Sequence, residues 1–236
     1  IFLMVFATHT WGADFGLKFH TTNGIKVGFI ELEGKIEKGD YEQYLDFAKL
    51  IKNKNMLLQG LILNSSGGLV DESLKIGRHV RKNGVFTTTR NEKEVKCYSS
   101  CALIWFAGIN RKAHSHLKSR SDPIWIEQIG VHRSYLKNAE KLSFGAMEKA
   151  LKSNHKIVEK YLNEMRVPNE IIQIFLNTAS SELTLIETNK YTRDRLYEEY
   201  VIAQCGPEVP EVEWPEYWMC SDDEAIRGKD FKIFAL

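Results

Sequence analysis

Hydrophobic residues along this chain recur with two periods, and the way these periods alternate predicts a mixed α/β fold. Short apolar or alternating runs, which favour strands, are separated by stretches with apolar residues three and four positions apart, which favour helices. The strand-like runs are 24–36, 57–63, 85–89 and 124–131. The helix-like stretches are 40–51, 69–82 and 102–107. This order predicts crossover units and a mainly parallel sheet covered by helices.

The later part of the chain has a different character. Residues 142–165 and 169–178 are both predicted to be helical, and from Gly206 onward acids and prolines become frequent. We therefore expect one α/β domain over residues 17–204, with a helical segment inside it and a C-terminal tail over 205–236 packed on its surface. The apolar stretch within residues 1–16 has no charge before Asp14 and is typical of a signal-peptide remnant or another N-terminal segment.

Composition narrows the functional classes. The chain has 236 residues, of which 43% are hydrophobic and 27% charged, as in an ordinary globular protein. Its 32 basic residues nearly balance its 31 acidic ones, so no strong positive field favours nucleic-acid binding. We expect no metal, no cofactor and no contact with a membrane except through an N-terminal signal or anchor.

The four cysteines form two pairs in the sequence, and an even count is typical of proteins in an oxidising compartment. Cys205 and Cys220 flank a proline-rich loop, where a bridge would stabilise the fold by roughly 3 kcal/mol. Cys97 and Cys101 would lie about 6 Å apart if both belonged to one helix, near the upper limit for bridging. We therefore favour the Cys205–Cys220 disulfide and a periplasmic or secreted location.

Three separated fragments carry the candidate chemistry: Asn64-Ser-Ser-Gly-Gly68, Cys97-Tyr-Ser-Ser-Cys101 and Gly130-Val-His-Arg133. Consecutive glycines after a strand allow backbone N–H groups to face a developing oxyanion. A serine at the start of an apolar helix lies where the helix N-terminus stabilises negative charge. A histidine that ends a strand can serve as a base. Together the fragments predict a serine hydrolase, although helix capping and structural roles explain each one alone.

These same fragments resemble the signature segments of the Clp protease proteolytic subunit, within the ClpP/crotonase superfamily. The Cys-x-Ser-x-Cys-Ala pattern at 97–102 is similar to that of secreted, periplasmic ClpP-like proteins of bacteria. The likeness covers roughly residues 24–196 and implies a ClpP/crotonase-like α/β fold. It also implies a serine endopeptidase with Ser99 as nucleophile, His132 as general base, and the N–H groups of Gly68 and Ser100 as oxyanion donors.

The resemblance also implies a peptide or protein substrate and a homo-oligomeric assembly, and the sequence departs from the family at the third catalytic position. The family's acid aligns with Ser181, while Glu182 and Asp194 are alternative partners for the imidazole. A missing acid costs a large part of the rate. Two other readings therefore stay open: a non-catalytic ClpP-like protein that binds peptides or proteins, and a crotonase-type acyl-CoA enzyme.

Overall fold

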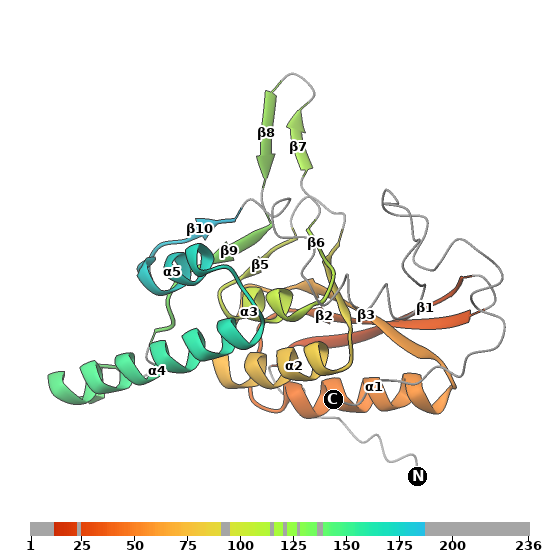
Figure 1. Ribbon diagram of the computed structural model, residues 1–236, viewed down its shortest axis with the longest axis horizontal. Helices are drawn as coiled ribbons and strands as arrows, with labels where there is room; N and C mark the ends of the chain where they lie inside the picture. The colour runs from red at the N-terminus through yellow and green to blue at the C-terminus, as the bar shows by residue number, and fades with distance from the viewer. Residues whose placement is uncertain are drawn as a thin grey trace, which may run out of the picture.

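The computed structural model describes residues 12–22, 25–90, 95–113, 116–119, 122–126, 128–135 and 139–186 (Figure 1). Its main sheet has five strands in the order β1-β2-β3-β4-β6, and every neighbouring pair except β1 and β2 is parallel. The strands are β1 (Asp14–Thr22), β2 (Ile25–Glu33), β3 (Leu57–Asn64), β4 (Phe86–Thr89) and β6 (Arg111–Lys112). The mixed α/β architecture with a mainly parallel sheet is thus confirmed.

A second, smaller sheet holds part of the candidate chemistry. Its order is β10-β9-β5, with β5 (Cys97–Tyr98) parallel to β9 (Ile129–Val131) and β10 (Thr184–Leu185) antiparallel to β9. The two strands β7 (His116–Ser119) and β8 (Asp122–Ile126) pair as a separate antiparallel ribbon that points away from the rest of the molecule (Figure 1).

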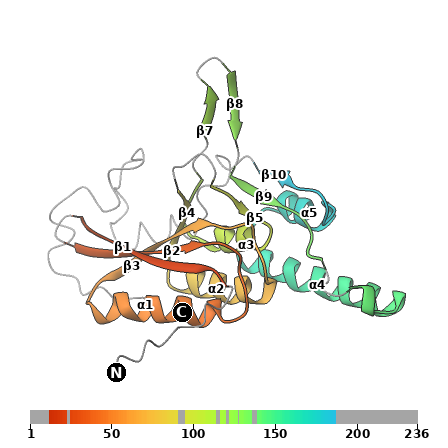
Figure 2. The same ribbon diagram turned by 180° about the vertical axis from the view of Figure 1, so that it is seen from behind.

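Two helices cover one face of the main sheet, as Figure 2 shows from behind, and α3 packs beside them. They are α1 (Asp40–Asn53) and α2 (Val70–Lys82). Helix α3 (Ser100–Ala107) contacts α2 and the strands β4, β5 and β9, and all eight of its residues are buried. Its uninterrupted apolar sequence follows from this environment, because a helix enclosed on every side needs no polar face.

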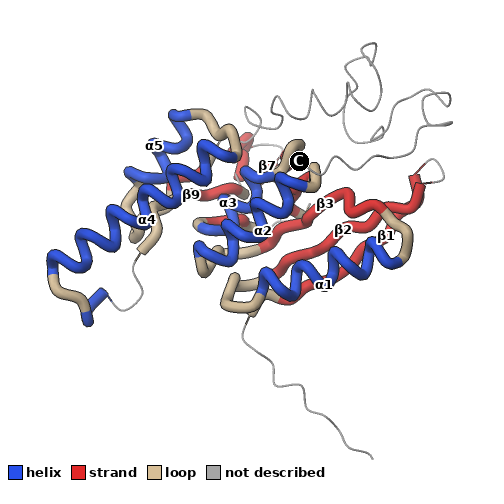
Figure 3. Tube along the Cα trace, turned by 60° about the horizontal axis from the view of Figure 1, so that its bottom comes forward, coloured by secondary structure: helices blue, strands red, loops and turns tan. Residues whose placement is uncertain are grey.

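Helices α4 (Phe144–Glu164) and α5 (Asn169–Asn177) form the far end of the molecule, and the first half of α4 extends away from the body (Figure 3). Only the second half is anchored, through buried Val158, Tyr161 and Leu162. The Tyr161 hydroxyl donates a 3.0 Å hydrogen bond to the Leu103 carbonyl, which ties α4 to α3. Burial raises the pKa of Tyr161, so this donor keeps its proton.

Some local expectations are corrected. Asp40, where the helix-like stretch 40–51 begins, is the first residue of α1, and its carboxylate accepts hydrogen bonds from the Ala13 and Glu37 N–H groups. The run 124–131 is divided between β8 and β9 rather than forming one strand. Strand β1 pairs with β2 from Asp14 onward and so begins before residue 17, while the division of the chain into domains stays a prediction. The expected tail, 205–236, lies outside the described residues.

Candidate active site

The candidate nucleophile lies at a sharp turn from strand to helix. Strand β5 ends at Tyr98, α3 begins at Ser100, and Ser99 between them has φ 57° and ψ −123°. This backbone conformation is costly for a residue with a side chain, by about 1–3 kcal/mol, and persists only when the surroundings enforce it. The Ser99 N–H donates to the Gly130 carbonyl at 2.8 Å, and the Tyr98 N–H donates to the Ser65 carbonyl at 3.0 Å. Two long-range contacts therefore hold the turn.

A disulfide encloses the same turn. Cys97 and Cys101 are bonded to each other, with Cα atoms 5.1 Å apart, and both are fully buried. The expectation that this pair would be the less favoured bridge is wrong, because Cys97 belongs to β5 and only Cys101 to the helix. The alternative bridge, Cys205–Cys220, lies outside the described residues. The disulfide closes a short covalent ring around Ser99 and Ser100.

The glycine turn packs directly on this structure. A Cβ atom added to Gly67, which has φ +94°, would lie 2.8 Å from the Ser99 Cβ and 3.1 Å from the Ser100 nitrogen. At Gly68 an added Cβ would collide with the backbone of Ile36. Both positions thus require glycine, and the Gly-Gly motif borders the serine turn as the sequence suggested.

The sequence suggests two N–H groups as oxyanion donors, those of Gly68 and Ser100. Within the described residues, neither the Gly68 N–H nor the Ser100 N–H donates a hydrogen bond. Ser100 is the first residue of α3, where the N–H groups of a helix have no intrahelical acceptor. An oxyanion bound to such donors is stabilised by about 3 kcal/mol per donor.

His132 follows β9 directly and enters the site from the strand next to Ser99. Its Nδ1 lies 2.8 Å from the backbone carbonyl oxygen of Arg133. A carbonyl oxygen only accepts, so Nδ1 carries the proton, and in the neutral ring Nε2 presents a lone pair. This is the tautomer that a general base requires. Among the described residues, no hydrogen bond joins the ring to the Ser99 hydroxyl; such bonds often tighten only once substrate is bound.

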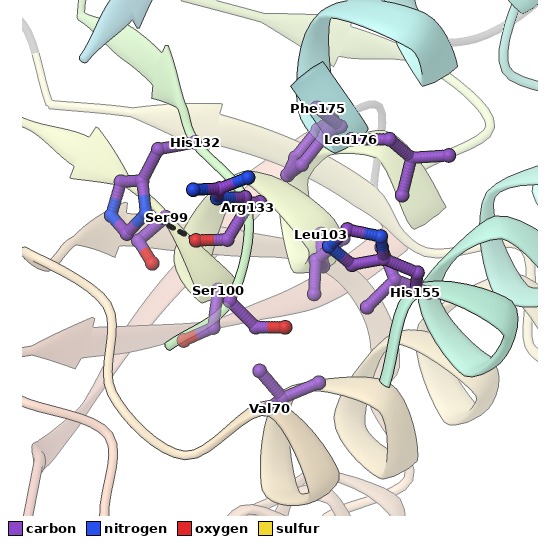
Figure 4. Close-up of a pocket in the computed structure, with 11 residues that line it drawn as sticks. Val70, Ser99, Ser100, Leu103, His132, Arg133, His155, Phe175 and Leu176 are labelled. Carbon is purple, nitrogen blue, oxygen red and sulfur yellow. Dashed lines mark hydrogen bonds between the residues drawn. The ribbon is translucent and has the colours of Figure 1, made fainter. Parts of the chain in front are cut away.

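Ser99 and His132 line one small pocket that is partly open to solvent (Figure 4). The lining contains both polar and apolar residues. The polar residues are Ser99, Ser100, His132, Arg133, Ser134 and His155. The apolar residues are Val70, Leu103, Val158, Phe175 and Leu176. The pocket therefore lies where the serine turn, the end of β9 and the helices α2 to α5 meet.

The third expected catalytic residue is not brought to this pocket. Ser181 is exposed in the turn that follows α5, and Glu182 beside it is exposed as well. Asp194 lies outside the described residues. The group that orients the His132 ring is instead the Arg133 carbonyl, and the Arg133 N–H is itself fixed by a 3.0 Å hydrogen bond to the Thr178 carbonyl. A backbone carbonyl has no signature in a sequence, so pattern analysis misses it.

Sequence analysis also missed His155 and Ser134. His155 lies three residues before buried Val158 and seven before buried Leu162, so all three occupy the inner face of α4. A histidine on an otherwise apolar helical face was the available signal. Ser134 lies two residues beyond His132, with nothing in its local pattern to distinguish it.

The described ranges contain neither a membrane-spanning helix nor a metal-binding cluster. None of the helices there is long and apolar enough to cross a membrane. Within the same ranges, no three histidine, cysteine, aspartate or glutamate side chains gather in a way that would hold a metal ion.

Comparisons with known proteins identify no family for this chain. The sequence matches no model of a known family and no curated protein. Among solved structures, the chain is similar to a Ser→Ala mutant of the membrane-bound stomatin-specific protease 1510-N, with 15% sequence identity and a TM-score of 0.48. The alignment covers 75% of this chain and 83% of the other. A likeness at this level carries no functional argument, so the case for a function comes from the pocket itself.

Proposed function

We propose that this chain is a serine peptidase of the ClpP-like type, acting on peptide or protein substrates. Ser99 is the nucleophile, His132 is the general base, and the Arg133 carbonyl orients the imidazole. The N–H groups of Ser100 and Gly68 receive the oxyanion. No cofactor or metal takes part in this scheme.

The reaction proceeds through an acyl-enzyme. The Ser99 oxygen attacks the substrate carbonyl carbon while its proton passes to His132 Nε2, and the negative charge moves to the carbonyl oxygen. The tetrahedral intermediate collapses, the C–N bond breaks, and His132 gives its proton to the leaving amine. Water then attacks the ester with His132 again taking a proton, which releases the acid and restores Ser99.

One observation carries this proposal: the strained backbone of Ser99. A serine that merely capped α3 would adopt an extended conformation and bond an N–H of the first turn, but Ser99 has positive φ and makes no capping bond. Strain at a serine between strand and helix is a feature of nucleophiles that must be exposed to substrate. The second support is the His132 tautomer, which leaves Nε2 as an acceptor in the same pocket.

Labelling with a fluorophosphonate tests the assignment. The wild type should be labelled at Ser99, as mass spectrometry of the digested protein would locate. Ser99→Ala should abolish labelling, and Ser100→Ala, at the neighbouring position, should preserve it. His132→Gln should slow labelling by about 10² or more, since the general base is lost. Labelling that survives Ser99→Ala, or a wild type that stays unlabelled while folded, would refute the assignment.

The carbonyl behind His132 also sets the expected rate. A carboxylate stabilises the imidazolium that forms during attack, whereas a neutral carbonyl dipole offers much less. Hydrolysis should accordingly be slow compared with enzymes that carry a complete triad.

A second candidate function is peptide binding without catalysis. It is favoured by the lack of any carboxylate against the His132 ring and of a Ser99–His132 hydrogen bond, both within the described residues. An unlabelled wild type that still binds peptides would select it. A crotonase-type enzyme would instead be stabilised by coenzyme A in a thermal melt of the same preparation.

The compartment forms part of the proposal. The Cys97–Cys101 disulfide is of the kind that persists outside the reducing cytosol, which supports a periplasmic or secreted protein. If the protein is periplasmic or secreted, Cys97 and Cys101 should stay unmodified when cysteines are alkylated in cells lysed under acid, because both sulfurs are bonded in the disulfide.

A further inference from the structure

The pocket beside Ser99 contains polar groups that the proposed reaction does not use. The side-chain atoms Ser134 Oγ and His155 Nε2 are buried and have no hydrogen-bond partner among the described residues. The same holds for Ser100 Oγ, on a residue that is only 2% exposed. All three residues line the pocket, and Figure 4 shows His155 on the side opposite His132.

Such a cluster is unusual for a folded protein. More than nine in ten buried polar groups have a partner, because an unpaired one costs about 1–3 kcal/mol. Three unpaired atoms from three separate segments, all at one pocket that opens beside a strained serine, point to a ligand group that completes them.

The chemical groups that line the pocket indicate which kind of ligand it would bind. Two hydroxyls and an imidazole can each donate a hydrogen bond, and a carboxylate is the side-chain group that accepts several at once. Arg133 lines the same pocket and forms no ion pair with any described carboxylate, and no aspartate or glutamate is among the lining residues. Leu103, Val158 and Phe175 provide an apolar wall for the methylene groups that precede the carboxylate.

We infer that this pocket receives an acidic substrate side chain, with glutamate as the best fit, and that His155 and Ser134 determine this specificity. The inference rests on the proposed peptidase function. Ser99 and Ser100, which would hold the acyl carbon and its oxyanion, line the same pocket. The side chain that enters is accordingly the one on the acyl side of the scissile bond.

Binding is the first test, because it does not need catalysis. Acetyl-Ala-Ala-Glu-amide and acetyl-Ala-Ala-Gln-amide, titrated into the Ser99→Ala protein, should differ in Kd by roughly tenfold or more in favour of glutamate, the usual gain for hydrogen bonds to a charged group. His155→Leu should remove most of that difference. His20→Leu, which replaces an exposed histidine of β1, is the matched control and should keep it.

Hydrolysis is the second test. Coumarin amides of the same acyl tripeptides should show a similar glutamate preference in kcat/KM, which His155→Leu loses, while the control His20→Leu keeps both this preference and the rate of fluorophosphonate labelling at Ser99. Labelling at Ser99 together with equal kcat/KM for the glutamate and glutamine coumarin amides would overturn the specificity but leave the peptidase assignment intact. Without labelling, the peptidase assignment fails. Equal or undetectable binding of the two amides then overturns the inference on its own account.

Discussion

Glycine usually lowers the stability of a folded protein, but at the strained position of Ser99 we expect it to raise stability. Ser99→Gly should stabilise the protein relative to Ser99→Ala, because glycine adopts φ 57° and ψ −123° at no steric cost while alanine retains the strain. The strain amounts to about 1–3 kcal/mol. Glycine also gives the unfolded chain more freedom, which offsets about 0.5–1 kcal/mol. The net gain is therefore about 1.2 kcal/mol at the middle of these two ranges, and at most about 2.5 kcal/mol.

Urea denaturation under non-reducing conditions measures this difference. With a denaturant slope of about 2 kcal/mol per molar, the midpoint of Ser99→Gly should exceed that of Ser99→Ala by about 0.6 M, and by at most about 1.2 M. Ser153→Gly is the matched control, since Ser153 is exposed in the interior of α4, where glycine costs a few tenths of a kcal/mol or more. If Ser99→Gly unfolds at lower urea than Ser99→Ala, the turn is not strained and the main support for the nucleophile is lost.

Three further outcomes test other parts of the structure. Replacing Cys97 and Cys101 together by serine should cost about 2 kcal/mol for a ring this short and slow fluorophosphonate labelling; unchanged labelling would show that the bridge does not support the turn. Burial lowers the pKa of His79 below its ordinary 6.5, so the unfolded state binds more protons and stability should fall as pH drops below about 6.5; melts of His79→Gln should show a shallower dependence. Gly77→Ala should lower stability by about 1–3 kcal/mol in urea, since the new methyl would collide with the Tyr161 hydroxyl, and an unaltered midpoint would contradict this packing.

The parts of the fold that the sequence predicts are those with strong local periodicity. The apolar run at 57–63 lies in strand β3, and the apolar stretch at 102–107 lies in the buried helix α3, because burial on all sides favours an uninterrupted apolar pattern. Short edge elements such as β5 and β10 escape detection. Two residues are too few to show a period, and long-range pairing alone defines these strands.

Local sequence patterns also indicate only some of the residues of the candidate site. The glycine turn and His132 are recognisable because each follows a predicted strand, and Ser99 is recognisable because it precedes an apolar helix. The disulfide at Cys97 was misjudged because a helix was assumed to begin before it, and the true start at Ser100 changes the distance between the two cysteines. His155 joins the pocket through the packing of α4 on α3, and its place on the apolar face of α4 is its one local sign in the sequence.

The hydrogen bonds that hold the serine turn also determine when in the life of the chain it can exist. Ser65 precedes the turn and Gly130 follows it, so a growing polypeptide has both partners only after β9 has left the ribosome. Before both hydrogen bonds can form, Ser99 should keep a relaxed backbone conformation, because no contact compensates the cost of the strained one. Contacts so distant in sequence form late in folding. The reactive geometry is consequently a property of the finished domain, and partly folded chains cannot share it.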